Sequence, residues 1–170
     1  MGTLLRRAGC ALLVALTVVP VATARVRDTD GVGFVWPADG VITSPFGPRA
    51  GGFHPGIDIG SLQSLTVRAA SSGRVAAVGA VVGYEGYGNV VLLDIGGGFT
   101  TMYAHLTRPI ARAGSLVARG DTIGIAGCTG WCTGTHLHFE LRDHGEPVNP
   151  IGFFGPATGV GYTPSLIQGG

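Results

Sequence analysis

The sequence predicts an all-β fold, mostly antiparallel and rich in hairpins. Glycine accounts for 31 of the 170 residues, whereas its usual share is about 7%, and the glycines show no fixed period. They separate short segments rich in Val, Ile and Leu, as turns separate the strands of an all-β protein. Amphipathic helix patterns are nearly absent, which excludes an α/β or helical architecture.

The first half of the chain contains two regions with strand patterns. Residues 41–43 form a β-branched run that leads into the turn-forming segment 44–49. Residues 66–82 are β-branched and alanine-rich, with glycines at positions 73 and 79. This pattern favours a hairpin over 66–82.

Three further regions with strand patterns follow. Residues 89–95 are apolar, and the three glycines 96–98 form a turn into the run 99–105. Residues 113–124 place turn residues between single apolar residues, which favours two short strands around a tight turn. Residues 136–142 alternate between polar and apolar, as a strand with two different faces does.

The chain is expected to hold one folded domain. Residues 1–24 resemble a secretory signal peptide, with two arginines, an apolar run and a small-x-small cleavage site. That run is shorter than the roughly 20 residues of a membrane span; an uncleaved anchor is the alternative. We expect a short leader over 25–34, the domain over 35–150 and a Gly/Pro-rich tail over 151–170.

The charge of the expected mature chain is close to neutral. Without the two arginines of the signal it holds nine arginines, no lysine and ten acidic residues. This balance gives no reason to expect a nucleic-acid partner or an electrostatic membrane partner. The mature chain should lack an integral membrane segment, and nothing in it requires more than a monomer.

Two cysteines, Cys128 and Cys132, remain after the signal. An even pair in an exported protein favours a disulfide. Two free thiols are the first alternative, and zinc ligation by the cysteines is a more distant one. A disulfide here would shape the loop just before the second histidine motif.

Four of the five histidines gather in two motifs and at one strand end. The motifs are His54-Pro55-Gly56-Ile57-Asp58 and His136-Leu137-His138-Phe139-Glu140, and His105 ends the run 99–105. Side chains of a strand alternate between its faces, so the two histidines and the glutamate of the second motif share one face. The apolar residues between them should fill the core.

These residues predict a zinc site. A catalytic zinc takes three protein ligands, from imidazole nitrogens and carboxylate oxygens, and keeps one position open. His54, Asp58 and one histidine of the second motif would supply the three ligands. The other histidine of that motif and His105 would be free for acid–base catalysis. Histidines held in the core by backbone hydrogen bonds, or a metal site without catalysis, are the alternatives.

Five motifs in the same order make this chain resemble the lysostaphin-type (LytM-like) zinc endopeptidases, which cut peptide cross-links in bacterial peptidoglycan. The resemblance covers roughly residues 36–150. It rests on Ser44-Pro45-Phe46-Gly47-Pro48-Arg49, the two histidine motifs, Tyr103-Ala104-His105-Leu106 and a Gly114, Val117, Gly120, Ile123, Gly124 pattern. The resemblance implies an antiparallel β fold with an open substrate groove.

The resemblance also implies roles for single residues. It assigns His54, Asp58 and His138 to one zinc ion per chain, and His136 and His105 to catalysis. This chain departs from the family where Thr135 replaces a frequent proline, and in the two cysteines. The expected function is a secreted endopeptidase of the cell wall or periplasm that acts on peptidoglycan peptides. The rival is a secreted module that binds peptidoglycan or regulates another wall hydrolase without cutting.

Other residues near the motifs are weaker candidates. Arg49, Asn89 and Tyr103 are expected to line the groove, although Arg49 could equally form a structural ion pair and Tyr103 could equally lie in the core. Glu140 is expected to support a zinc ligand rather than bind zinc itself. Trp131 could be a substrate wall or an exposed anchor.

Overall fold

The computed structural model describes residues 33–154, and the regular secondary structure of this part of the chain consists almost entirely of strands. The two short exceptions are the 3₁₀ helices η1 (Glu85–Tyr87) and η2 (Pro150–Phe153). The strands are β1 (Val41–Ser44), β2 (Gly47–Arg49), β3 (Gly52–His54), β4 (Ile57–Gly60), β5 (Thr66–Arg68), β6 (Gly73–Ala80), β7 (Asn89–Gly96), β8 (Phe99–Ala104), β9 (Leu106–Pro109), β10 (Leu116–Val117), β11 (Thr122–Ala126), β12 (Leu137–Asp143) and β13 (Glu146–Val148).

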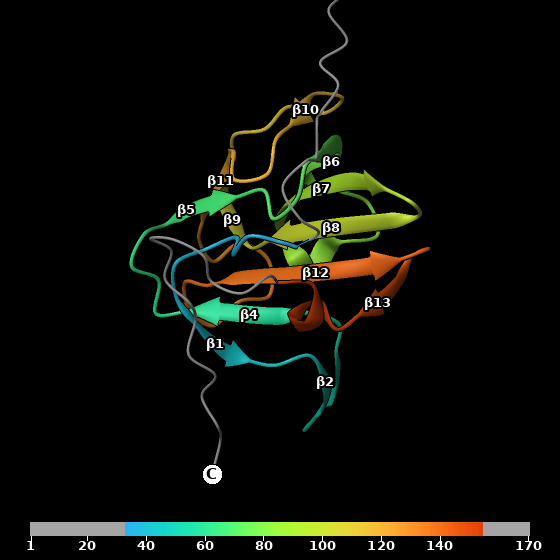
Figure 1. Ribbon diagram of the computed structural model, residues 1–170. Helices are drawn as coiled ribbons and strands as arrows, with labels where there is room; N and C mark the ends of the chain where they lie inside the picture. Colours follow the sequence, from blue (N-terminus) through green and yellow to red (C-terminus); the bar gives the residue numbers. More distant parts are fainter. Residues whose placement is uncertain (1–32, 155–170) are drawn as a thin grey trace, which may run out of the picture.

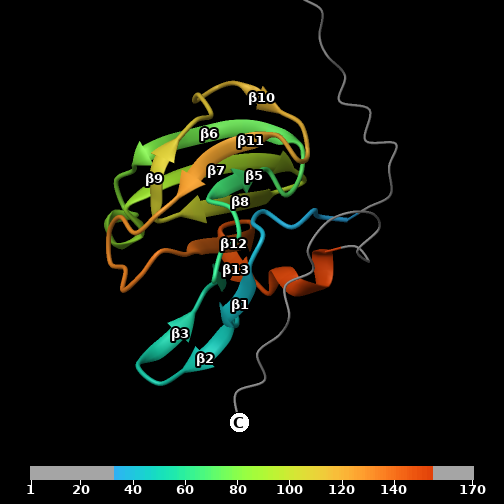
Figure 2. The ribbon, with the colours of Figure 1, turned by 90° about the vertical axis from the view of Figure 1, so that its left-hand side faces the viewer.

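The strands form one large sheet, one small sheet and a separate hairpin, and all their pairings are antiparallel. The large sheet has the order β1-β4-β12-β8-β7-β6-β10, with β13 paired to β12 (Figure 1). The small sheet has the order β5-β11-β9, and β2 pairs with β3. Figure 2 shows that the β2–β3 hairpin projects from the end of the molecule opposite β10. The all-β, antiparallel prediction is therefore confirmed.

Two predicted hairpins are absent, however. In region 66–82, β5 and β6 do not pair with each other: β5 joins β11, while β6 joins β7 and β10. In region 113–124, β10 pairs with β6 and β11 pairs with β5 and β9. Each pair of neighbouring strands is thus divided between the two sheets. Local turn chemistry predicted strands here, but burial between the two sheets decided their partners.

The core lies between the two sheets, and β12 separates this core from the site. Its residues Leu137 and Phe139 belong to the core cluster, together with apolar residues of β4, β5, β7, β9 and β11. Between them, His138 and Glu140 point to the opposite face, as the alternation of a strand requires. The apolar side chains therefore fix a strand whose other face carries the chemistry.

The two ends of the described chain meet and extend the domain. Phe34 forms a parallel bridge with Phe154, and the rings of Trp36 and Phe154 stack with centroids 3.9 Å apart. The leader and tail predicted over 25–34 and 151–170 thus each contribute residues to the folded domain. The predicted signal over 1–24 lies outside the described residues. No helix within 33–154 is long and apolar enough to span a membrane.

An ion pair between Asp39 and Arg68 connects the segment before β1 to β5. The guanidinium donates from Nη1 to Asp39 Oδ1 at 3.0 Å and from Nη2 to Oδ2 at 2.7 Å. Planar, two-bond pairs of this kind are the stronger class of ion pair. The hydrogen bond from Arg68 holds the pKa of Asp39 below its usual value, against the opposing effect of burial.

We expect Asp39→Asn to destabilise the protein at pH 7 by about 1 kcal/mol, since the pair is partly exposed. A lowered folded-state pKa means that the carboxylate stabilises the fold above the unfolded pKa of about 3.9. This contribution is lost as pH falls through the lower folded-state pKa. Urea unfolding of both proteins, with chelator present, should show a difference at pH 7 that shrinks below pH 4. An equal difference at both pH values would contradict this account.

Candidate metal centre and active site

Two neighbouring strands of the large sheet bring the predicted metal ligands together. In the pairing of β4 with β12, Asp58 stands opposite His138, so the two side chains start from adjacent backbone positions. His54 ends β3, and the Pro55-Gly56 link returns the chain to β4. These three residues come from both predicted motifs, which lie far apart in the sequence.

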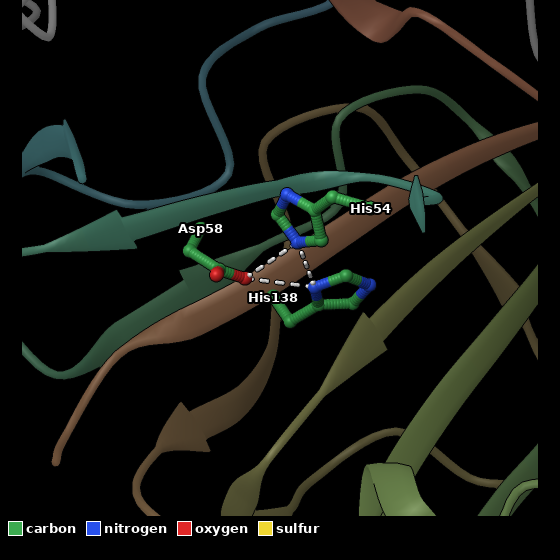
Figure 3. A group of neighbouring side chains, drawn as sticks. All are labelled: His54, Asp58 and His138. Atoms are coloured by element: carbon green, nitrogen blue, oxygen red, sulfur yellow. Dashed lines mark hydrogen bonds and ion pairs between the residues drawn. The ribbon is translucent and has the colours of Figure 1, made fainter. Parts of the chain in front are cut away.

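The three side chains converge on one point (Figure 3). Asp58 Oδ1 lies 2.8 Å from His138 Nδ1 and 3.2 Å from His54 Nε2. The two imidazole nitrogens lie 3.1 Å apart. One nitrogen or oxygen from each residue thus lies within 4.8 Å of the other two. Two imidazoles and a carboxylate match the ligand set that zinc accepts.

The outer contacts of both imidazoles determine which nitrogen faces this point. His54 Nδ1 lies 2.7 Å from the carbonyl oxygen of Pro45, and His138 Nε2 lies 2.9 Å from Glu140 Oε1. Both outer partners accept hydrogen bonds, so these nitrogens donate. A neutral ring then directs a lone pair from its other nitrogen inward. Two such lone pairs and a carboxylate oxygen repel one another unless a cation lies between them, so the residues fit a metal ion.

Gly56 permits the close approach of β4 to β12. A Cβ atom at this position would collide with the backbone oxygen of Phe139 and would lie 3.0 Å from the His138 ring. A side chain here would push Asp58 away from His138. The glycine in the His-Pro-Gly-Ile-Asp motif is therefore required by packing beside the site.

Glu140 holds the His138 ring in place through the hydrogen bond to its outer nitrogen. It is fully buried and also accepts a hydrogen bond from Arg142 Nε at 2.6 Å. Tyr87 bonds to the same carboxylate, and its ring lies 5.3 Å from that of His138 between centroids. A carboxylate on the outer nitrogen fixes the orientation and raises the basicity of a metal-binding imidazole. The supporting role that the sequence predicts for Glu140 agrees with this geometry.

Two more histidines stand beside the convergence point. The ring centroids of His105 and His136 lie 4.7 Å apart, and His136 Nε2 lies 3.7 Å from Asp58 Oδ1. His105 Nδ1 donates to the carbonyl of Thr129 at 2.8 Å, and His136 Nδ1 donates to that of Gly134 at 2.8 Å. Each neutral ring therefore keeps an Nε2 that can accept a proton.

The electrostatics of the site favour charged carboxylates and a cation among them. Burial would raise the pKa of Asp58, but hydrogen bonds from His138 and His54 hold it well below its usual range. Burial would lower the pKa of His138, but its bonds to Asp58 and Glu140 raise it. Burial lowers the pKa of His105 and favours its neutral form.

A pocket of about 610 Å³ opens over these residues. It is lined by the four site histidines, Asp58 and Arg49, among others. Arg49 Nη1 lies 3.1 Å from Ser44 Oγ and 3.9 Å from Asp58 Oδ2. Its side chain is half exposed, so Arg49 combines the two roles that the sequence left open.

Tyr103 does not line the pocket, and that prediction was wrong. Its side chain has no exposed surface because alternation along β8 turns it into the core. The backbone N–H of Ala70 donates to its hydroxyl at 2.7 Å, and burial raises its pKa to about 12. Asn89 is likewise absent from the pocket lining; its side chain donates to the carbonyl of Leu106 at 3.1 Å.

Two further segments line the pocket, and the sequence had pointed only to the first, through its cysteine pair and Trp131. A disulfide joins Cys128 to Cys132, and Trp131 between them lines the pocket with 88% of its surface exposed. The second is the glycine-rich segment 83–87. Nothing in the sequence pointed to this segment, because its residues follow no period and no metal-ligand spacing.

The family model of Peptidase family M23 matches residues 52–150, the stretch that contains all five site residues. The chain belongs to peptidase family M23. This assignment agrees with the predicted lysostaphin-type resemblance. The catalytic domain of the antimicrobial peptidase lysostaphin from Staphylococcus simulans has 29% identical residues and a TM-score of 0.56, over 72% of this chain and 89% of that one.

Curated relatives in the M23 family differ in their named roles. The DD-carboxypeptidase/endopeptidase Mpg of Neisseria meningitidis is 39% identical over 133 residues, 75% of this chain and 29% of that protein. The murein hydrolase activator NlpD of Salmonella dublin is 35% identical over 116 residues, 68% of this chain and 30% of that protein. The chain thus spans less than a third of the length of these relatives.

Proposed function

We propose that this protein is a secreted zinc endopeptidase that hydrolyses peptide cross-links of bacterial peptidoglycan. One observation carries the proposal: a converging metal-ligand set and two further histidines share one open pocket. A metal site that served structure alone would be closed and would need no free imidazoles beside it. Membership of the M23 family supports the same reaction class.

The chain's own residues would hold the zinc ion and orient the substrate. His54 Nε2, Asp58 Oδ1 and His138 Nδ1 are the ligand atoms. When bound, zinc supplies Lewis acidity, which polarises a carbonyl group and makes a water molecule more acidic. Arg49 at the pocket edge offers hydrogen-bond donors to a carbonyl or carboxylate group of the peptide.

The two remaining histidines would move the protons. His136 Nε2, held toward the site by the Nδ1 bond to Gly134, takes a proton from the attacking water. His105, kept neutral by burial, stands beside it and shares this task. The imidazolium that results stabilises the negative oxygen of the tetrahedral intermediate and then protonates the leaving amine. No residue of the chain needs to form a covalent bond with the substrate.

The first test is mass spectrometry of muropeptides after purified peptidoglycan is incubated with the purified protein. We expect loss of cross-linked dimers, and no loss when a chelator removes the metal. The masses of the products would identify the bond that is cut. Intact dimers in the presence of bound zinc would reject the endopeptidase function.

The relative named as a murein hydrolase activator favours a second candidate function, in which the protein stimulates another wall hydrolase without cutting. The same incubation distinguishes the two when a purified cell-wall amidase is added. A regulator would raise the yield of amidase products and release nothing alone. An endopeptidase would release its own products without the amidase.

A further inference from the structure

The disulfide loop Cys128–Cys132 forms part of the proposed active site, because it lines the pocket and contacts the site histidines. It connects β11 to β12, and just outside it Gly127 bridges to His136 through a hydrogen bond from His136 N–H to the Gly127 carbonyl at 3.2 Å. The loop therefore ends next to β12, the strand that carries His138. Any change in its shape is transmitted directly to the residues on either side.

Thr129, inside the loop, holds His105. Its carbonyl accepts the bond from His105 Nδ1, and its hydroxyl donates to the carbonyl of Leu106 at 3.0 Å. The same hydroxyl accepts from the N–H of Asn89 at 3.0 Å. Thr129 thus binds the His105 ring, the backbone of the next residue Leu106 and the first residue of β7. His105 itself has a φ of 59°, a conformation that a non-glycine residue keeps only where its surroundings enforce it.

The other residues of the loop reach the opposite histidine and the pocket wall. Cys132 Sγ lies 3.7 Å from His136 Nδ1. Trp131 N–H donates to the carbonyl of Gly86 at 2.9 Å, and its indole covers Gly86, where a Cβ atom would lie 3.3 Å from the ring. The N–H of His105 in turn donates to the carbonyl of Tyr87 at 2.9 Å. The loop and segment 86–87 are thus hydrogen-bonded to each other, and each is also hydrogen-bonded to His105.

We propose that the Cys128–Cys132 disulfide is a positioning device for the histidine pair. The bond holds the loop in the shape that presents the Thr129 carbonyl to His105 Nδ1, which keeps Nε2 of His105 available to the groove. Opening the bond would release Thr129 and leave His105 without its fixed orientation. The expected loss of rate rests on the proposed function. The orientation of the His105 ring can be measured independently of it.

The test compares Cys128→Ser/Cys132→Ser with the wild type, both loaded with zinc. A misplacement of about 1 Å in an active site can reduce the rate about 100-fold, so we expect kcat to fall about 10- to 100-fold with KM little changed. Zinc should remain at one per chain. Nuclear magnetic resonance of the imidazole nitrogens should show loss of the pure Nδ1–H form of His105, a signature that a general loss of stability does not produce.

Two further measurements keep the test decisive if the double variant does not fold. Thr129→Val removes the hydroxyl and keeps the disulfide, and it should also disturb the His105 signal; Thr100→Val on β8 is the matched control. Alternatively, a phosphine reductant opens the disulfide in the folded wild type. The phosphine and one water molecule become the phosphine oxide, and the disulfide takes the two hydrogens of that water and becomes two thiols. Unchanged kcat and an unchanged His105 signal after reduction would overturn the proposal.

The outcome separates this inference from the proposed function. If the wild type cuts no peptidoglycan, the endopeptidase function fails. The His105 spectrum still decides whether the loop positions that ring. If the wild type cuts and the reduced protein cuts equally well, the positioning role fails and the function stands.

Discussion

His136→Ala should lower kcat by roughly 10²–10⁴, the usual contribution of a positioned general base, while zinc remains bound. The three residues whose donor atoms converge are His54, Asp58 and His138, so removal of the His136 imidazole leaves the ligand set complete. His136 stands at the edge of this group, with Nε2 3.7 Å from Asp58 Oδ1. The rate should be measured on cross-linked muropeptides and the zinc content on the same sample.

The matched control for this variant is His144→Ala. His144 is an exposed histidine that bonds to its neighbour Asp143 at 2.6 Å and does not line the pocket. The same substitution there should leave kcat and zinc content unchanged. If His136→Ala loses its zinc while His144→Ala keeps it, the roles of His136 and His138 are exchanged.

Asp58→Asn should weaken zinc binding by at least about 100-fold and abolish turnover at ordinary zinc concentrations. Loss of a supporting residue alone typically costs 10- to 100-fold in metal affinity, and Asp58 supplies the negative charge of the ligand set itself. It is also the common partner of both ligand imidazoles, at 2.8 and 3.2 Å. Competition with a chromophoric zinc chelator measures this loss directly.

Asp143→Asn provides the control, because it makes the same chemical change at a half-exposed carboxylate on the same sheet. Its zinc affinity should equal that of the wild type. Wild-type affinity in Asp58→Asn would show that the metal lies elsewhere. Saturating zinc offers a further check: activity that returns in Asp58→Asn assigns the carboxylate to binding rather than to proton transfer.

The strongest sequence predictions concern residues whose position follows from local rules. Strand alternation alone places His138 and Glu140 on one face and Leu137 and Phe139 on the other, and the structure has this arrangement. The spacing of imidazole and carboxylate donors indicated a metal site before any fold was known. The alternation is confirmed, and the predicted donors lie together in the structure. Both predictions rest on covalent geometry and ligand chemistry, which require no knowledge of distant contacts.

The failures have a common physical cause. For Tyr103 the sequence left both the groove and the core open, and the structure buries it completely in the core. Its hydroxyl finds a partner in the core instead. Region 66–82 has the pattern of a hairpin, yet its two strands lie in different sheets. Strand pairing depends on which faces need burial, and a short window does not contain that information.

The amino-acid sequence by itself determined the strand-rich architecture, the two histidine motifs and the chemistry that they allow. Only the tertiary structure decided which nitrogen of each imidazole faces the metal position, because the outer partners Pro45 and Glu140 select it. The tertiary structure also brought Thr129 and its disulfide loop to His105. The bond between His105 and Thr129 joins residues 24 positions apart, so it forms only when burial of the shared core has brought their segments together.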